Sequence, residues 1–98
     1  MHYDIEPVVI ETLCILQEEC AEVVQAVSKV FRFGALNKYC PDDKTNRQRF
    51  ADELGDLQAM IDLVIQSGFV SKKELDAAKA AKLAKLAEWS NLKALDNV

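Results

Sequence analysis

The sequence predicts an all-α protein: a helical bundle of three main helices per chain, completed by oligomerisation. Apolar residues recur at steps of three and four along two long segments, a third segment is rich in alanine, and no alternating strand pattern occurs. Half of the 98 residues are apolar, so the chain can form a packed core. This length corresponds to one domain covering residues 1–98.

The first helix is expected to begin near Pro7, where a proline costs no hydrogen bond, and to end at Gly34. It would contain about 27 residues and extend roughly 40 Å. Further apolar residues widen its apolar stripe to more than half of the circumference, which indicates burial on more than one side. A helix this long is unusual in a small monomer, so we expect at least a dimer. The stripe consists of Val9, Leu13, Leu16, Cys20, Val23, Val27 and Val30.

The second and third helices are each preceded by a capping box. Thr45 and Gln48 form the first, after a loop over residues 34–44, and Ser71 and Glu74 form the second. The second helix should run to about Ser67. Its apolar stripe is Phe50, Leu54, Leu57, Ile61 and Val64.

Acidic residues gather beside the apolar stripes of the first two helices. Residues three or four apart are neighbours on a helix, so Glu19 pairs with Glu22, and Glu53 pairs with Asp56. If the two helices pack antiparallel, the pairs can meet at one level. Glu18 adjoins the first pair. The alternative interpretation is that these carboxylates are a solvated helix face.

A divalent cation would relieve the repulsion among such carboxylates. An all-oxygen ligand set favours Mg²⁺, with Mn²⁺ possible, over zinc. Three cysteines without a C-x-x-C motif and a single histidine argue against zinc and di-iron sites. Gly55 lies between the acids of the second helix at a cost of up to ~1 kcal/mol relative to alanine, which a closely approaching helix or ligand would justify.

Basic and aromatic residues supply candidates for substrate binding. Lys79 and Lys82 on the third helix are candidate phosphate ligands, although they could equally be solvated lysines of an alanine-rich helix. Lys29 and Arg32 are secondary candidates. Trp89 or Phe33 could stack on a base, the alternative being core or interface packing.

Charge and hydropathy exclude several classes of protein. A net charge of −4 argues against a protein that coats nucleic acid, which needs a strongly basic face. No apolar run approaches the ~20 residues that span a bilayer. No signal peptide pattern is visible, so we expect a cytoplasmic protein with neither nucleic acid nor membrane as partner.

The acidic motifs resemble a known family. The pattern E-E-x-x-E at residues 18–22, followed by E-L-G-D at residues 53–56, is similar to the MazG-like branch of the all-α NTP pyrophosphatase superfamily. The run A-E-V-V-Q-A-V-S-K-V-F-R-F-G at 21–34 and T-N-R at 45–47 extend the likeness. The chain resembles the short stand-alone members of phage type.

The resemblance implies a homodimer or homotetramer that cleaves a nucleoside triphosphate, with Mg²⁺, between the α- and β-phosphates. The products would be the monophosphate and pyrophosphate. Glu19, Glu22, Glu53 and Asp56 resemble the metal ligands of the family, and Glu18 resembles the adjoining acid that orients a water. The alternative is a non-catalytic helical dimer that binds a protein or a nucleotide, suggested by the wide apolar surface of the first helix.

Overall fold

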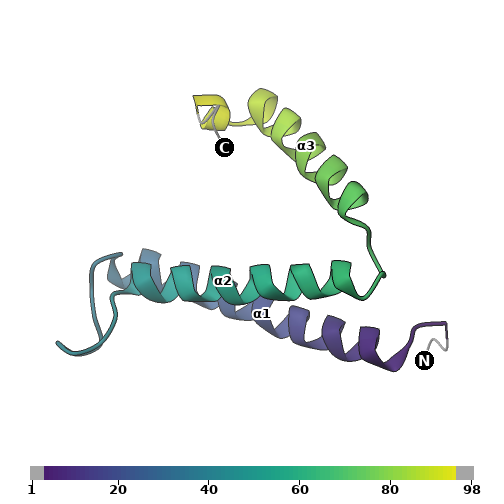
Figure 1. The fold of residues 1–98 in the computed structure, drawn as a ribbon. Coiled ribbons are helices and arrows are strands. Elements are labelled where there is room, and N and C mark those ends of the chain that lie inside the picture. The colour runs from purple at the N-terminus through teal and green to yellow at the C-terminus, as the bar shows by residue number, and fades with distance from the viewer. Residues whose placement is uncertain (1–3, 95–98) are drawn as a thin grey trace.

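The computed structural model describes residues 4–94, and over this range the chain is helical (Figure 1). Helix α1 covers Pro7–Phe33, α2 covers Asn46–Gln66, and α3 covers Lys72–Trp89, followed by a short 3-10 helix, η1, at Asn91–Ala94. Between residues 4 and 94 there is no β-strand, only one isolated bridge between Lys38 and Thr45. The predicted all-α class with three main helices is therefore confirmed.

The helix ends have the capping chemistry expected from the sequence. The Thr45 hydroxyl accepts from the Gln48 N–H, and the Gln48 side chain accepts from the Thr45 N–H at 2.8 Å. Ser71 and Glu74 form the same reciprocal pair at the start of α3. At the end of α1, Gly34 has a φ of 92° and its N–H donates to the Val30 carbonyl. This left-handed backbone is one that glycine adopts without strain.

Helices α1 and α2 lie side by side as an antiparallel hairpin (Figure 1). The loop between them is attached to the first turn of α2. The Asn46 N–H donates to the Asn37 carbonyl at 3.0 Å, and its side-chain amide donates to the Gly34 carbonyl, also at 3.0 Å. The Arg47 N–H donates to the Ala35 carbonyl. These bonds hold the closed end of the hairpin and set the level at which residues of α1 face residues of α2.

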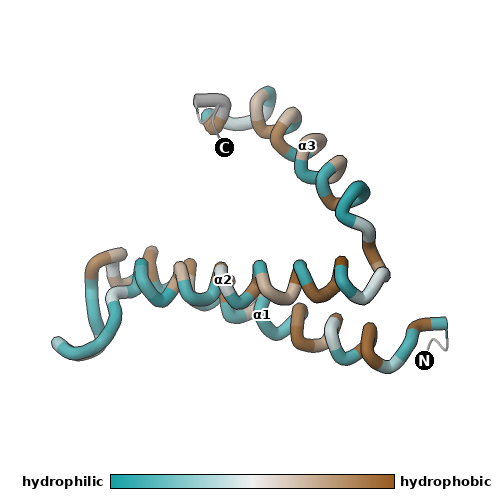
Figure 2. The backbone as a smooth tube through the Cα atoms, in the orientation of Figure 1, coloured by the Kyte–Doolittle hydropathy of each residue, from teal (hydrophilic) through white to brown (hydrophobic). Residues whose placement is uncertain are grey.

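The core between the two helices is thin. Among the described residues, only Val9, Ala26 and Val64 are buried, while brown apolar segments recur along both helices (Figure 2). Val24 and Phe31 on α1 are 68% and 83% exposed. A two-helix hairpin has one seam, so it cannot bury a stripe that covers more than half of α1.

Helix α3 stands away from the hairpin. It follows a turn at Gly68, whose φ is 85°, and it packs mainly against η1 rather than against α1 or α2 (Figure 1). Within the described part of the chain, no helix has an apolar stretch long enough to cross a bilayer.

Candidate metal centre and adjoining cleft

Three carboxylates from two helices converge on one point of the hairpin. Glu19 of α1 and Glu53 and Asp56 of α2 each offer an oxygen, and these oxygens all lie within 4.8 Å of one another. Glu53 and Asp56 share a face because they are three residues apart on α2. The antiparallel packing of α1 places Glu19 at their level. We call these three residues the acidic triad.

The acidic triad suits a small, hard cation. Mg²⁺ binds oxygen ligands at about 2.1 Å, so two oxygens on opposite sides of the ion lie about 4 Å apart. The limit of 4.8 Å on the separation of the triad oxygens is close to that value. Among the described side chains, the ion pairs are Lys44–Asp52, Arg49–Asp43 and Lys72–Asp76. Within that set no cation neutralises the triad.

The electrostatic cost of this arrangement is concentrated on Glu19. Desolvation raises the pKa of Glu19 above its ordinary value of 4.5, and repulsion from Asp56, Glu53 and the nearby Glu22 and Glu18 raises it further. Both effects disfavour the charged form. A bound divalent cation would reverse them by stabilising the carboxylate.

The other two predicted acids lie outside the triad. Glu22, one turn further along α1, lines a cleft together with Glu53. Glu18 is exposed on α1 beside Glu19. The structure thus brings three of the five candidate acids into one group and places a fourth at its border.

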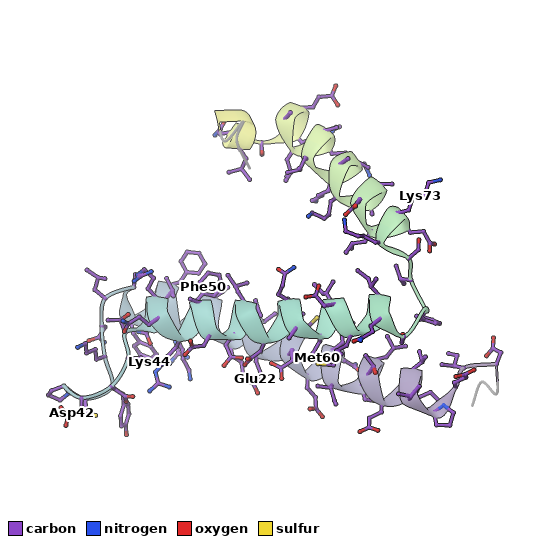
Figure 3. The ribbon with its side chains drawn as sticks, viewed as in Figure 1. Glu22, Asp42, Lys44, Phe50, Met60 and Lys73 are labelled. Atoms are coloured by element: carbon purple, nitrogen blue, oxygen red, sulfur yellow. The ribbon has the colours of Figure 1, made fainter. Side chains whose placement is uncertain are left out.

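A cleft of about 510 Å³ opens next to the acidic triad. It runs between α1, the 34–45 loop and the start of α2; Figure 3 labels Glu22, Asp42 and Lys44, which line it. Five carboxylates and three cationic side chains face this cleft. They are Glu22, Asp42, Asp43, Asp52, Glu53, Lys29, Lys44 and Arg49, with Gln25, Ala26 and Asn46 completing the wall. Without a bound cation the excess of carboxylates would repel a phosphate chain.

Two of the three cations are held in place by acids of the same cleft. The Lys44 ammonium donates to Asp52 at 2.6 Å, and the Arg49 guanidinium donates to Asp43. Such pairs contribute little to stability when exposed, but they restrict the positions of the long side chains. Lys29 and Arg49 reach the cleft from α1 and α2, on either side.

A second cleft of about 690 Å³ continues from the first toward the loop. The two share Lys29, Asp43, Asn46 and Arg49. Phe33 and Tyr39 line only the second cleft. The hairpin therefore has a groove that starts beside the acidic triad, passes four cationic side chains (Lys29, Lys38, Lys44 and Arg49) and ends beside two aromatic rings.

The remaining predicted binding residues lie elsewhere. Arg32 stacks over the Phe33 ring, 4.9 Å from its centroid, and lines neither cleft. Lys79 and Lys82 are on α3, and neither borders a cleft of the hairpin, because α3 stands apart from it. Trp89 is 83% exposed. Within one chain, these residues are not brought to the acidic triad.

Eight residues that line the first cleft are not among the candidates from sequence: Gln25, Ala26, Asp42, Asp43, Lys44, Asn46, Arg49 and Asp52. The position of Arg49 could have been predicted from the sequence, because Arg49 precedes Glu53 by four residues and so lies on the same row of α2. Lys44 and Asn46 flank the capping residue Thr45, and their position depends on the fold of the loop.

Searches of family models, of curated proteins and of solved structures found no match to this chain.

Proposed function

We propose that this protein is a Mg²⁺-dependent nucleoside triphosphate pyrophosphohydrolase of MazG-like type. It would cleave the α–β phosphoanhydride of an NTP or dNTP and release the monophosphate and pyrophosphate. The observation that carries the proposal is the acidic triad at one end of a cleft whose walls present Lys29, Lys44 and Arg49. Carboxylates for a divalent cation and cations for phosphate oxygens are the two requirements of this chemistry.

Glu19, Glu53 and Asp56 would hold Mg²⁺, or Mn²⁺ in its place. When bound, the ion supplies charge neutralisation for the phosphates and lowers the pKa of a coordinated water. The cleft would place a water in line with the phosphorus that it attacks; the bond from that phosphorus to the α–β bridging oxygen would break, and its electron pair would stay on the departing product, the monophosphate or pyrophosphate. Glu22 lines the cleft but lies outside the triad, so it is the carboxylate proposed to accept the proton of the water.

Lys29 and Arg49 would bind the phosphate chain from the two helices, and Lys44 would bind it from the loop. Asp43 already orients Arg49 in the cleft. A planar guanidinium held in this way can make two parallel hydrogen bonds to a phosphate.

The proposal includes assembly into a homodimer or homotetramer. Its support is the thin core of the hairpin and the exposure of large apolar residues on α1. The setting we propose is the cytoplasm, where the nucleotide substrates are found.

The test is release of pyrophosphate from a panel of canonical and modified NTPs and dNTPs with Mg²⁺ or Mn²⁺. Glu53→Gln should lower the rate on the order of 100-fold or more, because the triad loses a charged ligand. Asp62→Asn, an exposed acid of the same helix outside the clefts, is the matched control and should retain the wild-type rate. Release no higher than that of Glu53→Gln, across the whole panel, would refute the proposal.

A variant of Arg49 separates substrate binding from metal binding. Arg49→Ala should raise KM on the order of tenfold, which corresponds to roughly 1.4 kcal/mol of lost phosphate binding. Arg47→Ala, an exposed neighbour outside both clefts, should leave KM unchanged. An equal effect of the two substitutions would remove Arg49 from the proposed site.

The second candidate is a non-catalytic helical module, favoured by the wide exposed apolar surface of α1. In such a module the carboxylates only repel one another. Glu19→Gln and Asp56→Asn would then raise thermal stability, and Mg²⁺ would not change the melting temperature of the wild type. Stabilisation by Mg²⁺ that both variants abolish would exclude this candidate.

A further inference from the structure

The proposed phosphate chemistry accounts for only part of the second cleft. This cleft lies at the loop end of the hairpin and has a volume of about 690 Å³, which is within the range of pockets that hold a small organic molecule (Figure 1). It is lined by Lys29, Phe33, Asn37, Lys38, Tyr39, Asp43, Asn46 and Arg49. Phe33, Asn37, Lys38 and Tyr39 line only this cleft, so they have no part in the chemistry proposed above.

Two aromatic rings border the second cleft, one from α1 and one from the loop. Tyr39 is 93% exposed and Phe33 is 51% exposed, so most of the Tyr39 ring is left for contact with another molecule. The Arg32 guanidinium lies over one face of Phe33 and borders neither cleft. Exposed rings beside cationic side chains are the arrangement on which proteins stack the bases of nucleotides. The two rings therefore offer a flat apolar contact to a planar ligand.

The rings lie at a distance from the acidic triad that suits an extended nucleoside triphosphate. Phe33 follows Glu22 on α1, and their separation along the helix is about 16 Å at a rise of ~1.5 Å per residue. Lys29 and Arg49 line both clefts, so they stand between the two ends of the groove. A metal at the triad and these cations would take the phosphates of such a ligand, which leaves the rings for its base.

The polar side chains of the second cleft are poorly suited to selecting one particular base. Rejection of a wrong base by several powers of ten requires polar groups that are buried and would be left unpaired. Among the side chains that the structure describes, no polar one is buried, and the Asn37 amide in this cleft is exposed. Water satisfies an exposed amide when the base offers no partner. Stacking, in contrast, is available to every base, because every base has a π-face.

We propose that the second cleft is the nucleoside subsite, in which the base of the substrate stacks on Tyr39 and Phe33 and is bound with little preference among the common bases. The inference rests on the proposed function, because the triad and the cations must hold the phosphates of the same molecule. It names the substrate class as nucleoside triphosphates of any common base rather than a single nucleotide. Tyr39 is the residue that distinguishes a nucleotide from a triphosphate without a base.

Binding of non-hydrolysable ligands with Mg²⁺ tests the subsite without any need for turnover. The ligands are the α,β-methylene analogues of ATP, GTP, CTP and UTP, and an abasic analogue that has a methyl group in place of the base. By calorimetry, the Kd values of the nucleotide analogues should agree within about tenfold, and the abasic analogue should bind more weakly by on the order of tenfold or more. A spread of about a hundredfold or more among the bases would overturn the proposal.

Variants of the loop separate stacking from other effects. Tyr39→Ala should weaken binding of every nucleotide analogue on the order of tenfold and leave the abasic analogue unchanged, whereas Tyr39→Phe keeps the ring and should bind like the wild type. Leu36→Ala, at an exposed loop position that lines neither cleft, is the matched control and should change nothing.

Two results for Tyr39→Ala would overturn the subsite and leave the metal and phosphate chemistry in place: no loss of affinity, or an equal loss for the nucleotide and abasic analogues. If none of the analogues bound to the wild type, the proposed function would be refuted, and the subsite with it.

Discussion

Glu19 is the residue at which the stability of the fold and the proposed metal binding make opposite demands. It is partly buried on α1 and faces two carboxylates of α2, so both desolvation and repulsion raise its pKa. A carboxylate in such a place weakens the metal-free protein and strengthens the affinity for a cation. This is the relation expected of a ligand site that is formed before the metal arrives.

Glu19→Gln should therefore raise the melting temperature of the metal-free protein at neutral pH. Because the folded chain holds this proton at a higher pH than the unfolded chain, the raised pKa favours folding at low pH, and the advantage is lost as pH rises through the folded-state pKa. The stabilising effect of the substitution should shrink as the pH approaches the ordinary value of 4.5. Thermal melts in EDTA across this range measure it. Glu18→Gln, at an exposed neighbouring position, is the control and should raise the melting temperature less. If Glu19→Gln did not raise the melting temperature, the electrostatic explanation would be wrong.

Gly55 offers a second test at the same scale. A Cβ built at this position meets nothing within 4 Å, so among residues 4–94 no helix makes the close approach that would justify a glycine here. Gly55→Ala should stabilise the protein by roughly 0.5–1 kcal/mol, since alanine is the better helix former. Urea unfolding measures the change. Destabilisation would indicate a neighbouring molecule packed on this side of α2.

At the scale of the elements, the residues at the start of α2 both stabilise the helix and position side chains of the cleft. Thr45 caps α2, and the next residues, Asn46 and Arg47, hold the loop through hydrogen bonds to Asn37, Gly34 and Ala35. The same turn carries Lys44 and Arg49 into the cleft. The cap of α3 has the same reciprocal pattern, with Ser71 and Glu74, but no such connection, because α3 stands apart from the hairpin.

The two caps should thus differ in their effect on binding. Thr45→Ala and Ser71→Ala should each cost about 1 kcal/mol of stability. Only Thr45→Ala should also weaken binding of Mg²⁺ with a non-hydrolysable triphosphate, by roughly threefold to tenfold, as measured by calorimetry. Equal affinities for the two variants would show that the cap does not position the cleft.

At the scale of the whole molecule, the single chain has one seam and little core. Val9, Ala26 and Val64 are the buried apolar residues of the part that the structure describes, so ligands and partners should have a large influence on stability. At a free Mg²⁺ concentration of 100 times its Kd, the expected stabilisation is about 2.7 kcal/mol. For a domain of this size that corresponds to a rise in Tm on the order of 10 °C or more.

Differential scanning calorimetry with and without Mg²⁺ should show this rise. Asp56→Asn should abolish it, because the triad would lose one of its charges, while the exposed Asp62→Asn should not. Ca²⁺ is an informative comparison, since its longer bonds of 2.3–2.6 Å and larger coordination number require a wider site. A wild type that Mg²⁺ does not stabilise would remove the triad as a metal centre.

Local chemistry made the helices of this protein predictable. Pro7 and Gly34 mark the ends of α1, and the reciprocal pairs at Thr45–Gln48 and Ser71–Glu74 mark the starts of α2 and α3, because these signals act within four residues. The row of Glu53 and Asp56 follows from the helix period alone. That Glu19 lies at the same level as Glu53 and Asp56 follows only if the two helices pack antiparallel.

The sequence by itself therefore determined the all-α class, the helix boundaries and the carboxylates of each helix, since all three depend on interactions between near neighbours. Only the tertiary structure decided that Lys44 and Asn46 line the cleft and that Lys79 and Lys82 do not. Those outcomes depend on the path of the loop and on the direction in which α3 leaves Gly68. The path of the loop and the direction of α3 depend on contacts between residues far apart in the sequence, which local sequence patterns do not encode.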